Sequence, residues 1–265
     1  MNLRLDGKRA LVSGSTAGIG LAIAIGLARE GASVIVNGRT QARVDEAIAK
    51  VKASATKPQA VTGVAADLGT EDGAKKLFSV FPDVDILVNN LGIFEAKPFF
   101  EVPDADWRRF FDVNVLSGVR LSRHYLRFML KENWGRIVFI SSESALNIPS
   151  EMIHYGMTKT AQLSVARGLA ELTAGTGVTV NSVLPGPTMS EGVNEFVSGL
   201  ASQQKTSPAE VEKGFFKTMR PSSLLKRFAT PEEVANLVTY VCSPLSSATN
   251  GAALRVDGGV VRSIV

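Results

Sequence analysis

Short apolar runs alternate with helix-like segments along this chain. Helical patterns of apolar and polar positions cover 18–30, 40–53, 70–80, 104–132 and 152–175. The apolar, β-branched runs between them are RALVS, SVIVN, QAVTGVAAD, DILVNN, GRIVFIS, GVTVNSVLP and, last, AALRVD. Strands that are apolar on both faces and alternate with helices are typical of a parallel sheet covered on both sides. The pattern therefore predicts an α/β fold, a doubly wound Rossmann-type domain with about seven parallel strands and helices on both faces.

No internal repeat, linker or low-complexity tract interrupts this order, so we expect one domain over 1–265. The segment 188–229 differs in composition, because it mixes Gly, Ser and Pro with apolar residues. It follows the sixth predicted strand, and such sheets bind ligands beyond the carboxyl ends of their strands. We therefore predict that 188–229 is a lid over the substrate. Its apolar residues form either that cover or a small core of their own: Met189, Phe196, Phe215, Phe216 and Met219.

Composition changes this picture little. The 265 residues are 45% hydrophobic and carry a formal net charge of +4, with Lys and Arg spread along the chain. This distribution predicts a mildly basic surface and no nucleic-acid partner. Without an 18-residue apolar run, and with a charged start unlike a signal peptide, we expect no membrane association and a cytoplasmic location. A single cysteine excludes an internal disulfide, and with two histidines far apart the sequence predicts no metal site.

A glycine-rich turn follows the first apolar run. The sequence SGSTAGIG comprises Ser13, Gly14, Ser15, Thr16, Ala17, Gly18, Ile19 and Gly20. A tight turn between a strand and a helix brings backbone N–H groups and the positive helix end close to a pyrophosphate. Three glycines alone are a weak sign of such a site. Their place directly after an apolar strand favours a dinucleotide.

The end of the second predicted strand, VNGRT, should meet the adenosine ribose. An acidic residue there accepts hydrogen bonds from both ribose hydroxyls and repels a 2′-phosphate, whereas an arginine attracts one. Gly38 occupies the expected acid position and Arg39 follows it. The sequence therefore favours NADP(H) as the cofactor, with NAD(H) as the alternative if Arg39 only caps an exposed turn.

A hydroxyl, a phenol and an ammonium follow at fixed spacings. Ser142 precedes Tyr155 by thirteen residues, and Lys159 follows Tyr155 by four in YGMTK. Reduction of a carbonyl needs a hydride from a cofactor and a proton from the protein. A free tyrosine has a pKa of about 10, and a lysine one helical turn later would stabilise the phenolate and lower that pKa. Ser142, at the end of the fifth strand, would hydrogen-bond the carbonyl oxygen.

In their order and spacing, these motifs resemble the short-chain dehydrogenase/reductase family over nearly the whole chain. The resemblance implies a catalytic tetrad of Asn114, Ser142, Tyr155 and Lys159, in which Asn114 holds a water that links Lys159 to solvent. It implies cofactor contacts from Gly14, Ser15, Thr16, Gly18, Ile19, Gly20, Arg39, Asp67, Leu68, Asn90, Gly92, Tyr155, Lys159, Pro185, Gly186 and Thr188. Leu91, in NNLG, replaces the family's usual alanine, and this departure is expected to reshape packing or the substrate wall.

The function that the resemblance implies is interconversion of a ketone or aldehyde with an alcohol, similar to that of 3-oxoacyl-carrier-protein reductases. Enoyl reduction is a weaker alternative, because that branch usually separates the tyrosine and lysine more widely and position 162 here is Gln162. A dinucleotide-binding protein without catalysis is the third hypothesis. The small-molecule substrate and the physiological direction stay open at this stage.

Three further residues and the assembly complete the predictions. His154 points about 100° away from Tyr155 around a helix, which favours a wall or surface role, and His124 is expected to be structural. Glu143 follows the predicted catalytic serine and either contacts a polar substrate or caps a loop. The resemblance implies a homo-oligomer, a tetramer or dimer. The apolar stripe in LSVARGLAEL faces a partner, its own sheet, or both.

Overall fold

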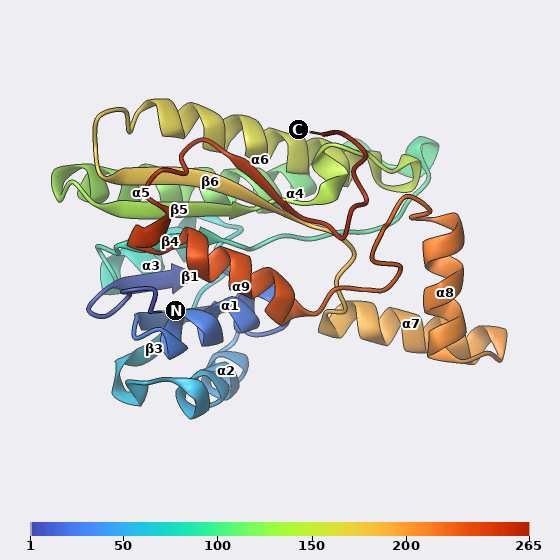
Figure 1. The fold of residues 1–265 in the computed structure, drawn as a ribbon, viewed down its shortest axis with the longest axis horizontal. Helices are drawn as coiled ribbons and strands as arrows, with labels where there is room; N and C mark the ends of the chain where they lie inside the picture. Colours follow the sequence, from blue (N-terminus) through green and yellow to red (C-terminus); the bar gives the residue numbers. More distant parts are fainter. Residues whose placement is uncertain (1, 265) are drawn as a thin grey trace.

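The computed structural model describes residues 2–264, and within them one sheet of seven strands forms the centre of the molecule (Figure 1). The strands are β1 (Arg9–Val12), β2 (Ser33–Gly38), β3 (Val61–Ala65), β4 (Ile86–Asn89), β5 (Gly135–Ile140), β6 (Val178–Pro185) and β7 (Ala253–Val256). All neighbouring pairs are parallel, in the order β3-β2-β1-β4-β5-β6-β7. The strand order reverses between β1 and β4, and ligands bind beyond the C-terminal ends of strands at such a point. The predicted seven-stranded Rossmann fold is confirmed.

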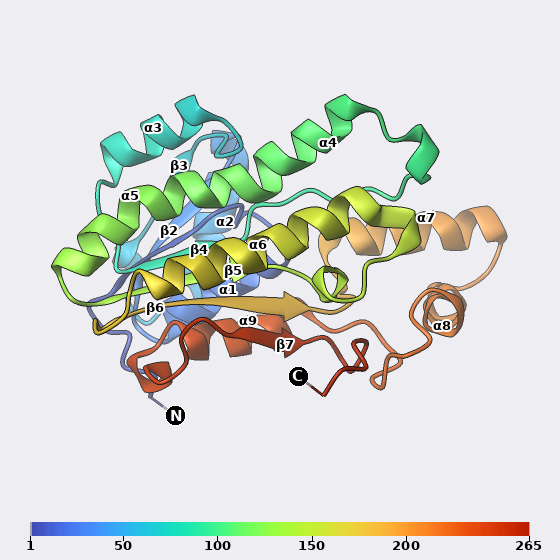
Figure 2. The same ribbon diagram turned by 90° about the horizontal axis from the view of Figure 1, so that it is seen from above.

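Helices cover both faces of the sheet (Figure 2). They are α1 (Gly18–Arg29), α2 (Gln41–Ser54), α3 (Glu71–Val80), α4 (Asp104–Phe111), α5 (Ser117–Lys131), α6 (Ile153–Glu171), α7 (Glu191–Gln204), α8 (Pro208–Thr218) and α9 (Pro231–Val241). Helices α1, α2 and α9 pack on one face, and α3, α5 and α6 pack on the other. Strands β4, β5 and β6 are buried along their whole length, so most of their positions are apolar. Buried polar side chains in them, such as those of Arg136 and Asn181, donate hydrogen bonds to backbone carbonyl oxygens.

Two cores result, because successive strand residues point to opposite faces. Val12 and Val88 belong to the core under α1 and α9, whereas Leu11 and Leu87 belong to the core under α5 and α6. Both cores hold the sheet rigidly below its C-terminal edge, where the predicted site residues lie. None of the helices in the described chain combines the length and the apolarity that a membrane span requires.

The helix predicted over 104–132 is present, but it is not uniform. Helix α4 runs into a π-helical segment, Asp112–Leu116, which continues directly as α5. Single π-helical turns inside α-helices are rare in proteins overall. Those that occur are frequently found at functional sites. This one carries the buried Asn114, one of the four predicted catalytic residues.

The segment 188–229 leaves the sheet after β6 and contains α7 and α8, which project beyond the C-terminal ends of the strands (Figure 1). It has a small core of its own in Val197, Phe216 and Phe228, against which Met189, Val193, Val211 and Phe215 pack. Of the two roles expected for these apolar residues, the structure confirms packing in a small core for Met189, Phe215 and Phe216. Met219 is outside this core and partly exposed, and the side chain of Phe196 lies outside the described residues.

Candidate functional site

The predicted glycine turn joins β1 to α1. Gly14 and Gly18 have φ values of 62° and 54°, which residues with side chains rarely adopt. Gly20 has no room for a side chain, because a Cβ there would lie 2.4 Å from Asn90 Nδ2 and 2.5 Å from the Gly14 carbonyl oxygen. Asn90 holds the turn by donating from Nδ2 to the carbonyl oxygens of Ser13 and Gly14, both at 3.0 Å. The two motifs SGSTAGIG and NNLG thus form one structure.

The start of α1 fits a pyrophosphate. Its N-cap residue, Ala17, makes no side-chain hydrogen bond to the helix, and the first turn contains no acidic residue. The first N–H groups and the positive helix end are therefore available to an anion. Ser15 is engaged within the fold, because its buried hydroxyl donates to the Val12 carbonyl oxygen at 2.7 Å and its N–H donates to the Asn37 carbonyl oxygen at 2.9 Å. Ser15 shapes the turn from inside and offers no free donor to a ligand.

The ends of β2 and β3 carry the residues predicted to meet the adenosine. Gly38 carries no acidic group, and a Cβ there would lie 2.4 Å from Thr16 Cγ2, so a larger residue would require the Thr16 side chain to move. Arg39 is exposed, and no hydrogen bond or ion pair ties its side chain to another described residue. Asp67 is also exposed, whereas the Leu68 side chain is buried in the core. Arg39 is therefore free to take a phosphate, and Leu68 has only its backbone to offer.

Ser142, Tyr155 and Lys159 lie together beyond the end of β5. Ser142 is buried, and its Oγ accepts from the Ser144 N–H at 3.1 Å. Tyr155 and Lys159 are one turn apart on α6, with Lys159 Nζ 5.6 Å from the centre of the Tyr155 ring. Burial raises the pKa of Tyr155 to about 12, and the nearby Ser142 hydroxyl opposes this rise. The phenol therefore stays protonated near neutral pH, and the predicted lowering of its pKa by Lys159 stays a prediction.

A hydrogen-bonded path leads away from Lys159. Burial lowers the pKa of the Lys159 ammonium to about 8. Its Nζ donates to the Ile140 carbonyl oxygen at 3.0 Å and to Gln162 Oε1 at 3.3 Å. Gln162 Nε2 donates in turn to the Asn114 carbonyl oxygen at 2.6 Å. Gln162 thus connects directly the two residues that the resemblance predicts to be linked through water, and its place one turn after Lys159 is the sequence signal for this contact.

The side chain of Asn114 clamps the loop after β4. Its Oδ1 accepts from the Ile93 N–H at 2.8 Å, and its Nδ2 donates to the Ile93 carbonyl oxygen and to Thr158 Oγ1, both at 3.0 Å. A Cβ on Gly92 would lie 3.4 Å from Lys159 Nζ. The loop of the NNLG motif is therefore held against the lysine of the predicted tetrad.

The segment after β6 is fixed at the same edge of the sheet. The Gly186 N–H donates to the Val256 carbonyl oxygen at 3.1 Å, and a Cβ on Gly186 would lie 2.5 Å from the Asp257 carbonyl oxygen. Thr188 Oγ1 donates to the Gly186 carbonyl oxygen at 2.9 Å. Pro185 is the last residue of β6, and Thr188 is the first residue of the predicted lid. The predicted nicotinamide segment, 185–188, therefore joins the sheet to the predicted lid.

Two side chains near the site have structural surroundings that the sequence left open. Leu91 is partly buried against the core under α5 and α6. His154 is 1% exposed, and its ring centre lies 4.3 Å from that of Phe110 and 6.0 Å from that of Trp107. Burial lowers the pKa of His154, and neither of its ring nitrogens has a hydrogen-bond partner among the described residues. The wall role predicted for His154 is supported, and the surface role is wrong because α4 covers the ring.

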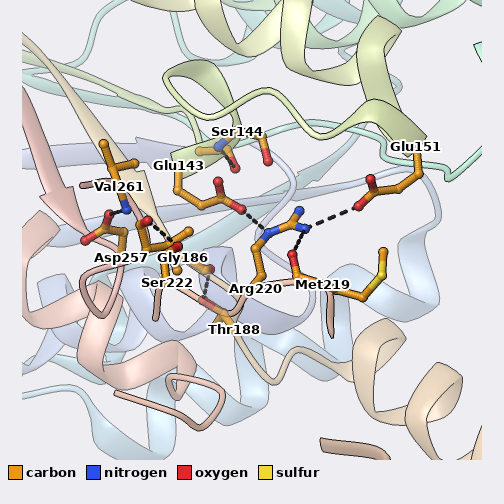
Figure 3. Close-up of polar contacts among 12 residues, drawn as sticks. Glu143, Ser144, Glu151, Gly186, Thr188, Met219, Arg220, Ser222, Asp257 and Val261 are labelled. Atoms are coloured by element: carbon orange, nitrogen blue, oxygen red, sulfur yellow. Dashed lines mark hydrogen bonds and ion pairs between the residues drawn. The ribbon is translucent and has the colours of Figure 1, made fainter. Parts of the chain in front are cut away.

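A buried ion pair joins Arg220 to Glu143, the residue that follows Ser142 (Figure 3). Arg220, which follows α8, donates from Nε to Glu143 Oε1 at 2.9 Å and from Nη1 to Glu151 Oε1 at 3.2 Å. Burial raises the pKa of the Glu143 carboxyl, against the attraction of Arg220. The sequence gives no sign of this pair, because Glu143 and Arg220 are 77 residues apart. The pairing ties the lid to the loop that carries the predicted catalytic serine.

Comparisons with known proteins identify a matching family model and several similar oxidoreductases. A family model described as enoyl-(acyl carrier protein) reductase matches residues 14–261. The uncharacterized oxidoreductase YvaG of Bacillus subtilis is 53% identical over 100% of both chains. The 3-oxoacyl-[acyl-carrier-protein] reductase FabG of Aquifex aeolicus is 35% identical over 98% of this chain and 100% of its own. The crystal structure of L-sorbose reductase from Gluconobacter frateurii, complexed with NADPH and L-sorbose, is similar with a TM-score of 0.91 and 29% identity, covering 100% of both chains.

Proposed function

This chain belongs to the short-chain dehydrogenase/reductase family, and we propose that it interconverts a ketone or aldehyde with an alcohol and prefers NADP(H). The bound nicotinamide supplies or takes the hydride. The observation that carries the proposal is the meeting of Ser142, Tyr155 and Lys159 at the C-terminal edge of the sheet, beside a glycine turn that fits a pyrophosphate. A nicotinamide dinucleotide is the cofactor type found with a structural relative.

The protein's own side chains donate the proton and stabilise the charges that form. With a pKa of about 12, Tyr155 is protonated at neutral pH and donates its proton to the alkoxide that forms during reduction. Ser142 donates a hydrogen bond to the carbonyl oxygen and stabilises its developing charge. Lys159, with a pKa of about 8, is mostly charged at neutral pH and favours the phenolate left behind. The path through Gln162 to Asn114 holds this ammonium in place.

The preference for NADP(H) rests on two features of the chain. Gly38 stands where an acid would repel a 2′-phosphate, and the Arg39 side chain is free to bind one. The NADPH complex of the structural relative supports the same choice. NAD(H) is the alternative.

Enoyl reduction is disfavoured by the Tyr–Lys spacing, although the matching family model is described as an enoyl reductase. Tyr155 and Lys159 are one helical turn apart, and Gln162, which follows, is occupied by Lys159 and Asn114. The proposed carbonyl chemistry uses the side chains of Ser142, Tyr155 and Lys159.

The remaining proposals concern the lid and the assembly. Residues 188–229 would cover the substrate, and the lid reaches the cofactor turn because a Cβ on Gly18 would lie 3.2 Å from Ser190 Cβ. A homo-oligomer is supported by the unpaired outer edge of β7 and by the exposed apolar side chains of Leu172 and Tyr240. Light scattering on the purified protein tests the oligomer, and a monomeric mass at working concentration would overturn it.

The test of the function is oxidation of NADPH and NADH, followed by absorbance, with diketones, aldehydes, cyclic ketones and 3-oxoacyl thioesters. Tyr155→Phe is the control, because it removes the proton donor and keeps the ring. We expect turnover that prefers NADPH and falls by about 10²- to 10⁴-fold in the variant. NADPH binding without turnover of any carbonyl would favour the non-catalytic hypothesis, and turnover of enoyl thioesters alone would favour the enoyl one.

A further inference from the structure

Of the two oxygens of the Glu143 carboxylate, one has a hydrogen-bond donor and the other does not. Glu143 is 3% exposed and directly follows Ser142. Its Oε1 accepts from Arg220 Nε, as Figure 3 shows, at a distance of 2.9 Å. Its Oε2 is buried, and although the neighbouring Ser144 hydroxyl is close enough to lower the pKa of Glu143, no described residue makes a hydrogen bond of normal geometry to Oε2. A buried carboxylate oxygen without a donor is costly, and such atoms are rare in folded proteins. A donor from a bound molecule would remove that cost.

This carboxylate lies at the predicted reaction centre. Its charge is close enough to raise the pKa of Tyr155, and the charge of Asp257 in turn raises the pKa of Glu143. The Asp257 backbone packs against Gly186, at the start of the predicted nicotinamide segment. Glu143 directly follows Ser142 and pairs with Arg220 of the segment 188–229, so its carboxylate joins the predicted catalytic serine to the predicted lid.

Arg220 is largely engaged by carboxylates, and among the described residues only its Nη2 has no partner. Its Nε is paired with Glu143, and its Nη1 with Glu151 and with the Met219 carbonyl oxygen at 2.9 Å. Two carboxylates around one guanidinium leave the group with a formal net charge of −1. A substrate carboxylate would meet this negative charge, and the desolvation of both would be uncompensated.

We propose that Glu143 Oε2 accepts a hydrogen bond from a hydroxyl group of the substrate, so that the preferred substrates are neutral hydroxyketones. This inference rests on the proposed carbonyl chemistry. Because the charge of Glu143 is already paired with Arg220, the oxygen needs a hydrogen-bond donor and not a second cation. A site built to bind a hydroxyl discriminates against an analogue that lacks it, since the buried polar atom then stays unpaired.

The experiment compares two ketones of nearly the same shape, hydroxyacetone and butanone, with saturating NADPH. Butanone has a methyl group where hydroxyacetone has its hydroxyl. We expect kcat/KM of the wild-type enzyme to favour hydroxyacetone, and Glu143→Gln to lower that ratio by about 10- to 100-fold, mainly through KM. The intrinsic reactivity of each ketone is the same with both enzymes, so the change in the ratio reports the contact alone. Acetoacetate, an anionic ketone of similar size, should be the poorest of the three.

The matched control is Glu151→Gln, which removes the other carboxylate on Arg220. It should weaken the lid contact and change kcat/KM for both ketones in parallel, leaving their ratio intact. A ratio that falls equally in the two variants, or in neither, would overturn the inference and leave carbonyl reduction standing. If Glu143→Gln does not fold, the wild-type enzyme still decides: equal kcat/KM for the two ketones, or a preference for acetoacetate, would overturn it. Failure of the wild-type enzyme to reduce any carbonyl would overturn the proposed function as well.

Discussion

Replacement of Gln162 by methionine should change the charge of Lys159 without changing the reacting groups. Gln162 is 1% exposed, accepts from Lys159 Nζ at 3.3 Å and donates to the Asn114 carbonyl oxygen at 2.6 Å. Methionine has a similar length and volume and no comparable donor or acceptor. The ammonium of Lys159 then keeps only the Ile140 carbonyl oxygen as an acceptor.

The magnitude follows from the geometry. A hydrogen bond to a charged group contributes about 1.5–3 kcal/mol, and 3.3 Å is longer than the usual length, so we take about 1.4 kcal/mol, or about one pH unit. The lost acceptor had favoured the charged form, so the pKa of Lys159 falls further below its value of about 8. Reduction needs the charged form of Lys159. The alkaline limb of the plot of kcat/KM against pH should therefore move down by about one pH unit. Loss of the hydrogen bond to the Asn114 carbonyl oxygen should also lower the free energy of unfolding by about 0.5–1.5 kcal/mol.

The assay is kcat/KM for ketone reduction against pH with saturating NADPH, together with urea unfolding. Thr158→Val is the matched control, because Thr158 accepts from Asn114 Nδ2 at 3.0 Å but does not contact Lys159 Nζ. It should lower stability and leave the alkaline limb in place. If Gln162→Met also loses stability while its limb coincides with that of the wild type, Gln162 serves packing alone and the reasoning is refuted.

Three further changes test the cofactor site and the lid. Arg39→Ala should raise KM for NADPH by about tenfold or more and leave KM for NADH unchanged, measured by initial rates; equal effects on both would contradict a 2′-phosphate contact. Gly20→Ala should abolish NADPH binding in fluorescence titration and cost about 1–3 kcal/mol of stability, because its Cβ would lie 2.4 Å from Asn90 Nδ2. Phe228→Ala should open the small core of the lid and speed proteolytic cleavage between α7 and α8, while the sheet stays protected; unchanged cleavage would show that the lid does not depend on that core.

The sequence predicts those parts of this molecule that depend on local patterns. A strand buried on both faces is mostly apolar, so β4, β5 and β6 can be recognised in the sequence although β5 and β6 also contain buried polar residues. The glycine turn is equally local, because strand, turn and helix follow one another within a few residues. The Tyr–Lys pair needs only the helical repeat of α6.

The lid was harder to predict, although one of its signals is local. Helix α8 begins with a capping box in which Ser207 Oγ accepts from the Glu210 N–H, and Pro208 follows the cap. Ser207, Pro208 and Glu210 predict the start of a helix even in a segment of mixed composition. The core that joins α7 to α8 has no such signal, because Phe228 lies beyond both helices and reaches it only through the fold.

The polar contacts that refine the site could not be predicted, because each joins distant parts of the chain. Gln162 and Asn114 are 48 residues apart, and Arg220 is 77 residues from Glu143. No spacing rule relates such pairs, and each residue alone has an ordinary reading as a surface or packing side chain. The family motifs therefore indicate the reaction, whereas the residues that we expect to set its pH dependence and substrate preference emerge only from the folded chain.

Several ion pairs join the segment 188–229 to the rest of the described chain, and two of them differ in what they contribute. Arg43 of α2 pairs with Glu191 at the start of α7 at 2.9 Å, but both side chains are about half exposed, so water and salt screen their attraction. Arg220 pairs with Glu143 in a buried setting, where removal of one partner leaves an uncompensated charge. The contact at Glu143 is therefore the more sensitive of the two to the loss of one partner. The same carboxylate that pairs with Arg220 is the one we expect a substrate hydroxyl to meet.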